Sequence, residues 1–368
     1  MRIAFYAPLK PPDHPVPSGD RRVAQLLLAA LRIAGYDTFI ASRFRTYDGS
    51  GDALRQARLA AIGERLARRF LRRCRETPEV APQLWFTYHL YHKAPDWLGP
   101  LIADELGIPY VVAEASDAPK QAYRAWATGR AAAENAIRRA DAVIGLNPTD
   151  RDCVLPLLRE PTRWVPFAPF VDAASYGPRR KKCGEPPRLI VVAMMRYGDK
   201  LSSYRLLGEA LSGLLDLPWS LEIIGDGAAR TEVEAALAPL KERILWTGVL
   251  GPAVIADRLA ASDLYVWPAV NEAFGMALLE AQASGLPVIA GDGSGIREIV
   301  MPDVTGLLVS PGDAPAFAVA ARSLIVDRVK RAAFAAAARR RVREEHDIPI
   351  AARRLAAVVA GLRETHSA

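Results

Sequence analysis

The feature that most constrains the fold is an alternation along the whole chain, in which short apolar segments are separated by longer amphipathic ones. This order is typical of βαβ units, where helices join the strands of a parallel sheet. Six strands are predicted in the first half (IAFYA, DTFIA, LWFTYHL, PYVVAEA, AVIGL and RWVPF) and six in the second (RLIVVAM, SLEIIGD, RILWTG, LYVWP, LPVIAG and GLLVS). We therefore expect an α/β protein with two Rossmann-like sheets.

A segment rich in proline, glycine and charge separates the two halves. Its prolines Pro178, Pro186 and Pro187 disfavour regular structure. The expected organisation is a first domain over residues 1–170, a linker over 171–187, a second domain over 188–345 and a terminal helix over 346–368. Because ligands of open α/β sheets bind at the carboxyl ends of the strands, the site is expected between the two domains.

The composition disfavours several classes of protein. No apolar run approaches the roughly 18 residues that a membrane-spanning helix needs, and the first residues form a predicted strand rather than an export signal. Cys74, Cys153 and Cys183 follow neither a disulfide framework nor a metal-ligand spacing. These observations favour a cytoplasmic protein with free thiols.

The net charge of +7 lies in the first half of the chain, where residues 55–75 hold eight arginines and one glutamate. Four apolar side chains of this segment share one helical face: Leu59, Ile62, Leu66 and Phe70. Two interpretations stay open. The helix docks on its own sheet with solvated arginines, or it rests on an anionic membrane or acceptor. Nucleic acid is a disfavoured partner, because no recognition fold accompanies the charge.

Two glutamates stand eight positions apart in the segment VWPAVNEAFGMALLEAQASG, which predicts a strand, a turn and a helix. Glu272 falls in the turn and Glu280 in the helix. Backbone amides at the helix start, from Phe274, Gly275 and Met276, suit a phosphate, and each carboxylate suits a pair of hydroxyl groups. A nucleotide sugar has this layout of ribose, diphosphate and hexose. The alternative is that both glutamates are ordinary surface residues.

Two cations and a glycine strengthen the nucleotide-sugar interpretation. Arg196 and Lys200 follow another strand of the second half, at the same predicted sheet edge, where they suit a diphosphate. Gly19 precedes the first predicted helix of the chain, where the backbone can approach a ligand closely. Solvated loop charges and an ordinary loop glycine are the alternatives.

The third predicted strand of the first half runs out into aromatic and hydrogen-bonding side chains. Tyr88, His89, Tyr91, His92 and Lys93 lie together in LWFTYHLYHK. Aromatic faces with polar tips suit a sugar or another ring-bearing acceptor. The alternative is that these residues are the core and the rim of a strand.

Two partial motifs carry less weight. Gly225-Asp226-Gly227 lacks the third glycine of a dinucleotide fingerprint, which also disfavours a nicotinamide-dependent oxidoreductase. Asp150-Arg151-Asp152 matches the D-x-D pattern of metal-dependent transferases, but it follows LNPT at a predicted helix start. We therefore interpret Asp150 and Asp152 as capping residues, and no metal is predicted.

Residues 188–313 resemble the donor domain of the family-4 glycosyltransferases. The blocks that carry the resemblance are RLIVVAMMRYGDK, LEIIGDGAARTEVE, RILWTG, ASDLYVWPAVNEAFGMALLEAQASGLPVIAG and GIREIVMPDVTGLLVSPGD. It is weaker in the first domain. It implies the GT-B fold, with two Rossmann-like domains, a deep interdomain cleft and a last helix that returns to the first domain. It also implies sugar transfer from a nucleotide diphosphate sugar with retention of anomeric configuration.

The resemblance assigns roles to single residues. Glu272 would bind the donor sugar at the reacting centre, and Glu280 would bind the ribose. Arg196 and Lys200 would neutralise the diphosphate, assisted by amides near Gly275 and Gly19. The nucleotide sugar is a co-substrate, and no other cofactor is implied. The acceptor would be a glycan, a lipid-linked molecule or a small molecule, met in the cytoplasm or at the inner face of the membrane.

The chain departs from the family pattern in its first domain. Ser18-Gly19-Asp20 stands where the family has a Gly-Gly pair, and PYVVAEASDAPK lacks the usual histidine. Glu114, Asp117 or Lys120 would replace it, or His92 of the neighbouring strand. We expect Asp117 and His92 to share the catalytic role with Glu272. A non-catalytic nucleotide-sugar binder, or a partner protein at a membrane surface, remains the alternative function.

Overall fold

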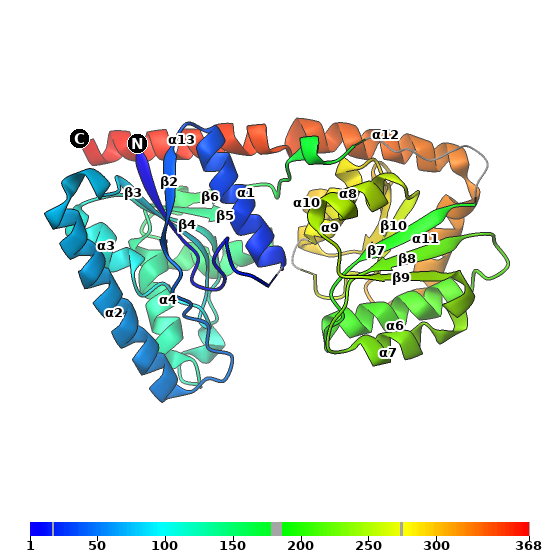
Figure 1. Cartoon of the computed structure of the whole chain (residues 1–368), viewed down its shortest axis with the longest axis horizontal. Helices are drawn as coiled ribbons and strands as arrows, with labels where there is room; N and C mark the ends of the chain where they lie inside the picture. The colour runs from blue at the N-terminus through cyan, green and yellow to red at the C-terminus, as the bar shows by residue number, and fades with distance from the viewer. Residues whose placement is uncertain (17, 178–185, 273–274, 368) are drawn as a thin grey trace. The chain divides into compact units, whose positions relative to one another are not determined.

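The computed structural model describes residues 1–16, 18–177, 186–272 and 275–367, without the side chains of residues 161 and 365–367. The chain forms two compact units, each with its own sheet and helices (Figure 1). The first unit combines Met1–Ala168 with Ile348–Ala368, and the second is Pro169–Asp347.

The first unit is a parallel sheet in the order β2-β1-β3-β4-β5-β6. Its strands are β1 (Arg2–Tyr6), β2 (Asp37–Ser42), β3 (Leu84–Leu90), β4 (Tyr110–Ala115), β5 (Ala142–Gly145) and β6 (Trp164–Pro166). Its helices are α1 (Gly19–Ile33), α2 (Ala53–Glu76), α3 (Gly99–Leu106), α4 (Ala127–Arg139), α5 (Arg151–Val154) and α13 (Ile348–Ser367). Each strand predicted in this half is confirmed.

The second unit repeats the plan in the order β12-β11-β10-β7-β8-β9. Its strands are β7 (Arg188–Val192), β8 (Ser220–Ile224), β9 (Ile244–Gly248), β10 (Leu264–Trp267), β11 (Val288–Gly291) and β12 (Gly306–Val309). Its helices are α6 (Asp199–Ser212), α7 (Arg230–Ala236), α8 (Pro252–Ala260), α9 (Met276–Ala283), α10 (Ser294–Ile299), α11 (Ala314–Val326) and α12 (Arg328–Glu345). The strands predicted in this half are confirmed too.

Both sheets reverse their order beside their first strand. In the first unit β1 lies between β2 and β3, and in the second β7 lies between β8 and β10. The loops after the two strands at such a reversal diverge to opposite faces of the sheet and leave room for a ligand between them. The β1/β3 and β7/β10 edges are therefore the places where each unit can hold one.

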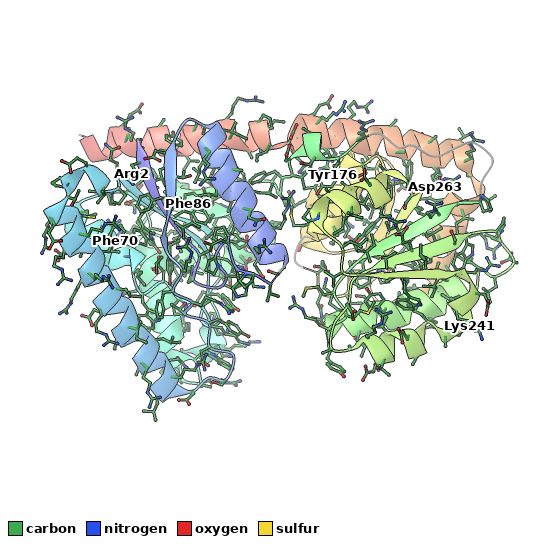
Figure 2. The ribbon with its side chains drawn as sticks, in the orientation of Figure 1. Arg2, Phe70, Phe86, Tyr176, Lys241 and Asp263 are labelled. Carbon is green, nitrogen blue, oxygen red and sulfur yellow. The ribbon has the colours of Figure 1, made fainter. Side chains whose placement is uncertain are left out.

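Aromatic stacking fixes α2 on the first sheet. Phe70 of α2 stacks on Phe39, with ring centroids 6.5 Å apart. It also makes a T-shaped contact with Trp85, with ring centroids 5.5 Å apart. Phe86, the next residue of β3 (Figure 2), points to the other face of the sheet and stacks on Phe5 of β1, with ring centroids 5.6 Å apart. Among the described residues, no helix combines the length and the apolar character needed to cross a bilayer.

The buried face of α2 differs from the predicted one. Leu66 and Phe70 pack partly against the core, but the fully buried positions include the small residues Gly63 and Ala67. A Cβ atom at Gly63 would lie 2.4 Å from that of Trp97. Close approach of the backbone at Gly63 thus places this helix together with the packing of Phe70.

The first residues of the expected linker belong to the second unit. The Val171 amide donates to the His346 carbonyl at 2.9 Å, and the Ala173 amide donates to Asp347 Oδ1 at 3.1 Å. Tyr176 is buried in the core of this unit (Figure 2). Residues 171–177 are therefore part of the second unit rather than a separate linker, while residues 178–185 lie outside the described part of the chain.

The last helix covers the first one. In α13, Leu355 and Val359 are buried, and the helix packs on α1. The Tyr36 hydroxyl, just after α1, donates to the Ala356 carbonyl at 3.4 Å. The first unit is thus built from two separate stretches of sequence.

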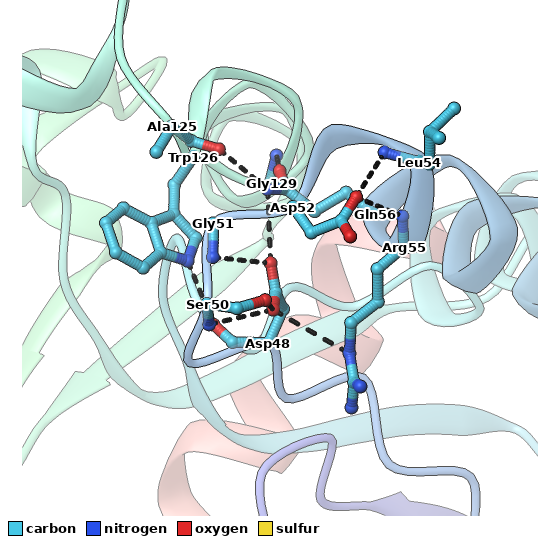
Figure 3. A network of polar contacts seen from close by, with 10 residues as sticks. All are labelled: Asp48, Ser50, Gly51, Asp52, Leu54, Arg55, Gln56, Ala125, Trp126 and Gly129. Carbon is cyan, nitrogen blue, oxygen red and sulfur yellow. Dashed lines mark hydrogen bonds and ion pairs between the residues drawn. The ribbon is translucent and has the colours of Figure 1, made fainter.

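Asp48 joins the start of α2 to the start of α4 (Figure 3). Its carboxylate is almost completely buried and accepts hydrogen bonds from Ser50, from the Gly51 amide at 3.1 Å and from Gln56 Nε2 at 3.2 Å. Its backbone carbonyl accepts from Trp126 Nε1 at 2.9 Å. Burial raises the pKa of Asp48, but these hydrogen bonds outweigh it and hold the pKa below its ordinary value.

We expect Asp48→Ala to lower the free energy of unfolding by about 2 to 4 kcal/mol, because Ser50, the Gly51 amide and the buried Gln56 lose a common, buried acceptor. Chemical denaturation measures this loss. The matched control is Arg55→Ala, which removes an exposed arginine 3.7 Å from the same carboxylate and should cost less than about 1 kcal/mol. Equal losses in the two variants would contradict the assignment of stability to the buried hydrogen bonds.

Candidate functional site

In the second unit, an ion pair spans the reversal between β7 and β10. Lys200, the second residue of α6, contacts Glu272 Oε2 in the loop after β10. The same oxygen accepts from Trp267 Nε1 at 3.3 Å, and the Lys200 ammonium lies over the Trp267 ring, 5.4 Å from its centroid. The structure therefore brings together two of the predicted donor residues and holds both against an indole.

Two further contacts tie the loop after β10 to α6. Ser203 Oγ accepts from the Val270 amide at 3.0 Å, and Asp199 Oδ1 accepts from Asn271 Nδ2 at 3.0 Å. Ala269 and Asn271 have positive φ angles of 54° and 49°. Such angles in residues other than glycine are costly and persist only where surrounding contacts impose them. The conformation that presents Glu272 is thus imposed by α6.

Arg196 is exposed on the loop between β7 and α6. Gly225 and Gly227 of the loop after β8 pack against the backbone of its loop. A Cβ atom at Gly225 would lie 1.9 Å from the Ala193 carbonyl oxygen, and one at Gly227 would lie 2.2 Å from that of Met195. The Gly-Asp-Gly run therefore supports the Arg196 loop, a structural role that the comparison with a dinucleotide fingerprint missed.

The helix that follows Glu272 begins at Met276. Gly275 precedes it with a φ of 61° and is buried. Glu280 is half-buried in the same helix, one turn beyond its start. Phe274, the third residue predicted to offer an amide, lies outside the described residues.

In the first unit, a polar group gathers at the β1/β3 reversal and on the strand beside it. His89 Nδ1 lies 2.9 Å from Oδ1 of Asp20, the second residue of α1. Glu114 lies at the end of β4, next to β3, and both His89 and Glu114 have positive φ angles, 58° and 62°. Gly19 begins α1, and a Cβ atom there would meet nothing within 4 Å. Space beside the first turn of α1 is therefore open.

We call Asp20, His89, Glu114 and Asp150 the acidic cluster, because their charges act on one another. Burial raises the pKa of Glu114 to about 7, and Asp150 and Asp20 raise it while His89 lowers it. Burial likewise raises the pKa of Asp150 to about 6. Burial would lower the pKa of His89, but the hydrogen bond and charge of Asp20 raise it overall.

Aromatic rings continue from the acidic cluster along the loop after β3. Ring centroids are 5.3 Å apart from His89 to Tyr91 and from Tyr91 to His92, and 5.8 Å apart from His92 to Trp126. The Lys93 ammonium lies over the Trp126 ring at 4.8 Å. These residues form an aromatic row. The predicted acceptor residues Tyr91 and Lys93 belong to it with His92, whereas Tyr88 is buried in the interior.

Two residues proposed as catalytic have other surroundings. Both carboxylate oxygens of Asp117 accept from Arg130, at 3.0 and 2.9 Å. Burial and the charge of Lys93 lower the pKa of His92, and its buried Nδ1 has no hydrogen-bond partner in the described part of the chain. Both oxygens of Asp117 are therefore engaged by Arg130, whereas the described residues place no arginine on Glu114.

Asp150 stands at the N-cap position of α5, as predicted, but its side chain makes no capping hydrogen bond. In the turn at Pro148–Asp150 the capping side chain is Asn147, which accepts from the Thr149 amide at 3.2 Å. The Asp150 carboxylate belongs to the acidic cluster instead. The sequence signal that could have found it is its place just after β5, at the same sheet edge as Glu114.

Comparison with known proteins gives a family match within the second unit. Residues 186–327 match the family model described as glycosyl transferases group 1. The D-inositol 3-phosphate glycosyltransferase of Rhodococcus erythropolis is 30% identical to this chain, over 72% of this chain and 66% of the relative. The sulfoquinovosyl transferase SQD2 of Arabidopsis thaliana is 32% identical, over 46% of this chain and 34% of the relative. The matches thus span from a third to just under two thirds of these relatives' length. The structure of Anabaena HepE in complex with UDP has the same fold, with a TM-score of 0.74, 16% identity and coverage of 98% of this chain and 100% of that one.

The pKa of Glu114 makes a stability prediction with a definite sign. Its ordinary value is 4.5 and its value in the fold is about 7, so ionisation opposes folding as the pH rises through that range. Glu114→Gln removes this penalty. We expect the variant to gain about 1 to 3 kcal/mol relative to the wild type on going from pH 4 to pH 8. Chemical denaturation at both pH values measures the gain, and substitution of the exposed Glu79 in Glu79→Gln is the control. If Glu114→Gln differs from the wild type by the same free energy of unfolding at both pH values, the raised pKa of Glu114 is contradicted.

Proposed function

We propose, from the premise that this chain belongs to the family-4 glycosyltransferases of the GT-B fold, that it transfers a sugar from a nucleotide diphosphate sugar to an acceptor. The donor binds the second unit at the β7/β10 reversal. The relatives named above have sugar-transferring activities in their names, and HepE was crystallised with UDP. The observation that carries the proposal is the contact of Lys200 with Glu272 at this edge.

The charges of this edge suit a diphosphate that lies beside a sugar. Arg196 and Lys200 provide positive charge on the loop and first turn after β7, and the amide end of α9 adds a partial positive charge. As the glycosidic bond breaks, negative charge grows on the diphosphate. Cations already in place stabilise that charge without reorganising. The proposal therefore needs no metal ion, and activity should persist in a chelator.

Glu272 has two roles in this proposal. Before the donor binds, its carboxylate balances the charge of Lys200. When the diphosphate attracts Lys200, Glu272 is released to accept hydrogen bonds from the sugar hydroxyls, while Trp267 keeps its orientation. The diphosphate also remains on the face of the sugar where the acceptor attacks, which agrees with retention of anomeric configuration.

The test is a thermal-shift panel of UDP, GDP, ADP and their sugars, followed by donor hydrolysis. A ligand that binds the folded state raises the melting temperature. We expect one nucleotide series to stabilise the protein and its sugar to be hydrolysed, with hydrolysis absent in Glu272→Ala. Binding without turnover would indicate a non-catalytic nucleotide-sugar binder, and no binding at all would overturn the proposal.

The two glutamates should separate nucleotide binding from sugar binding. Glu280→Ala is expected to weaken binding of the nucleoside diphosphate about tenfold, because it removes hydrogen bonds to a charged acceptor. Glu272→Ala should leave that binding nearly unchanged and instead remove the contribution of the sugar. Calorimetry measures both, with Glu242→Ala as an exposed control in the same unit. The opposite assignment of losses would refute the ribose role of Glu280.

We also propose contact with an anionic membrane through α2. Four of its arginines are exposed and make no ion pair within the described residues: Arg58, Arg65, Arg69 and Arg73. They recur at intervals of seven, four and four residues and so form one stripe along the helix. The last three each follow a buried residue by two positions, a rotation of about 200° that turns them away from the core.

The arginine stripe predicts binding to vesicles of anionic lipid, since each arginine near such a surface contributes about 1 kcal/mol. Replacing Arg65, Arg69 and Arg73 with Gln should abolish most sedimentation with these vesicles. The matched control replaces Arg68, Arg72 and Arg75, three exposed arginines that pair with Glu64, Glu76 and Glu105. Both variants lose three positive charges, so an equal loss of sedimentation would show that net charge alone drives binding. If the wild type does not sediment with the vesicles, the membrane proposal is wrong.

A further inference from the structure

The acidic cluster of the first unit contains an acceptor oxygen without a donor. Glu114 is 8% exposed, and its Oε2 is buried and has no hydrogen-bond partner among the described residues. The backbone amide of Leu146 interacts with its carboxylate. A buried carboxylate oxygen without a donor is costly, so a group that donates a hydrogen bond to it would be stabilised there.

The charges around Glu114 are unbalanced. Asp20, on α1, and Asp150, after β5, add to its negative charge, and His89 on β3 is the cation that acts on it. His89 is already hydrogen-bonded to Asp20. Lys10 acts on Asp20, and the neutral hydroxyl of Tyr88 also feels Glu114. Three carboxylates thus face the imidazole of His89 and, at Asp20, the ammonium of Lys10, so negative charge is in excess in a chain whose net charge is positive.

This imbalance selects among ligands. A phosphate would add negative charge to three carboxylates and would be repelled. A neutral hydroxyl would donate to Oε2 but would leave the charge uncompensated. A metal ion is not supported, because the described residues contain no group of three His, Cys, Asp or Glu side chains able to hold one. An ammonium group both donates hydrogen bonds and supplies the missing charge.

We propose that the acidic cluster binds a primary ammonium group on the acceptor, so that the acceptor is an amino sugar or an aminocyclitol whose ammonium donates to Glu114 Oε2. The inference rests on the proposed function, because it gives the chemical class of the acceptor for that transfer. Asp150, whose charge acts on Glu114, adds to the attraction for a cation. The aromatic row lies beside the cluster through His89, and its ring faces can pack against the body of the same molecule.

The experiment compares three probes that differ in one substituent: D-glucosamine, D-glucose and D-glucose 6-phosphate. Ligand-observed NMR titration of the full chain without nucleotide measures their affinities near pH 7, where Glu114 begins to ionise and the amine of D-glucosamine still carries its proton. We expect D-glucosamine to bind about tenfold or more tightly than D-glucose, the usual effect of a charge-assisted hydrogen bond, and D-glucose 6-phosphate to bind most weakly. Glu114→Gln and Asp150→Asn should each reduce the preference for the amine.

The control is Glu79→Gln, which removes an exposed carboxylate before β3, at the opposite edge of the same sheet. It should leave the preference intact. Thermal unfolding and nucleotide binding establish that each variant is folded and that its second unit is unaffected. Equal affinity for D-glucosamine and D-glucose, preference for the phosphate, or a preference that survives in Glu114→Gln overturns the inference. Because this titration contains no nucleotide, a negative result would overturn only the acceptor inference. The donor proposal is tested separately by the thermal-shift panel of nucleotides.

Discussion

The order of strands in a parallel sheet decides where charged side chains can meet. In both units the helix after the first strand carries a charged residue at its second position, Asp20 in α1 and Lys200 in α6. Each reaches a group across the reversal, His89 at the end of β3 or Glu272 after β10. The two contacts have opposite arrangements of charge, because the helix carries the acidic residue in the first unit and the basic residue in the second. One topology has thus produced two polar sites of different chemistry.

The difference between the sites lies in how their charges are balanced. The charges of Lys200 and Glu272 balance each other and both side chains are only half-buried, so exchanging one partner for a ligand costs less desolvation than at a fully buried pair. In the acidic cluster the carboxylates outnumber the cations, and burial keeps them in a medium where that imbalance is strongly felt. The first arrangement suits a ligand that carries both an anion and hydroxyl groups. The second suits one that brings a positive charge with it.

Much of this could be predicted from the sequence, because the strands are runs of apolar and β-branched residues bounded by loops. The approach of Lys200 to Glu272 followed from two strand ends at one sheet edge. Asp150 was missed because an aspartate near a helix start looks the same whether it caps the helix or faces a site. The face of α2 was misjudged because Gly63 and Ala67, although small, lie at its closest contact. Periodicity ranks large apolar residues first and so underrates such positions.

The position of α13 has a consequence for how the chain folds during synthesis. The second unit is one continuous stretch, whereas the first needs a helix that is translated after the whole of the second. Until α13 leaves the ribosome, the surface of α1 that it covers stays in contact with water, and the earlier unit remains incomplete. The later unit can therefore finish folding first, reversing the usual amino-to-carboxyl order of domain formation. During that interval the nascent chain displays an apolar surface on which a chaperone can bind.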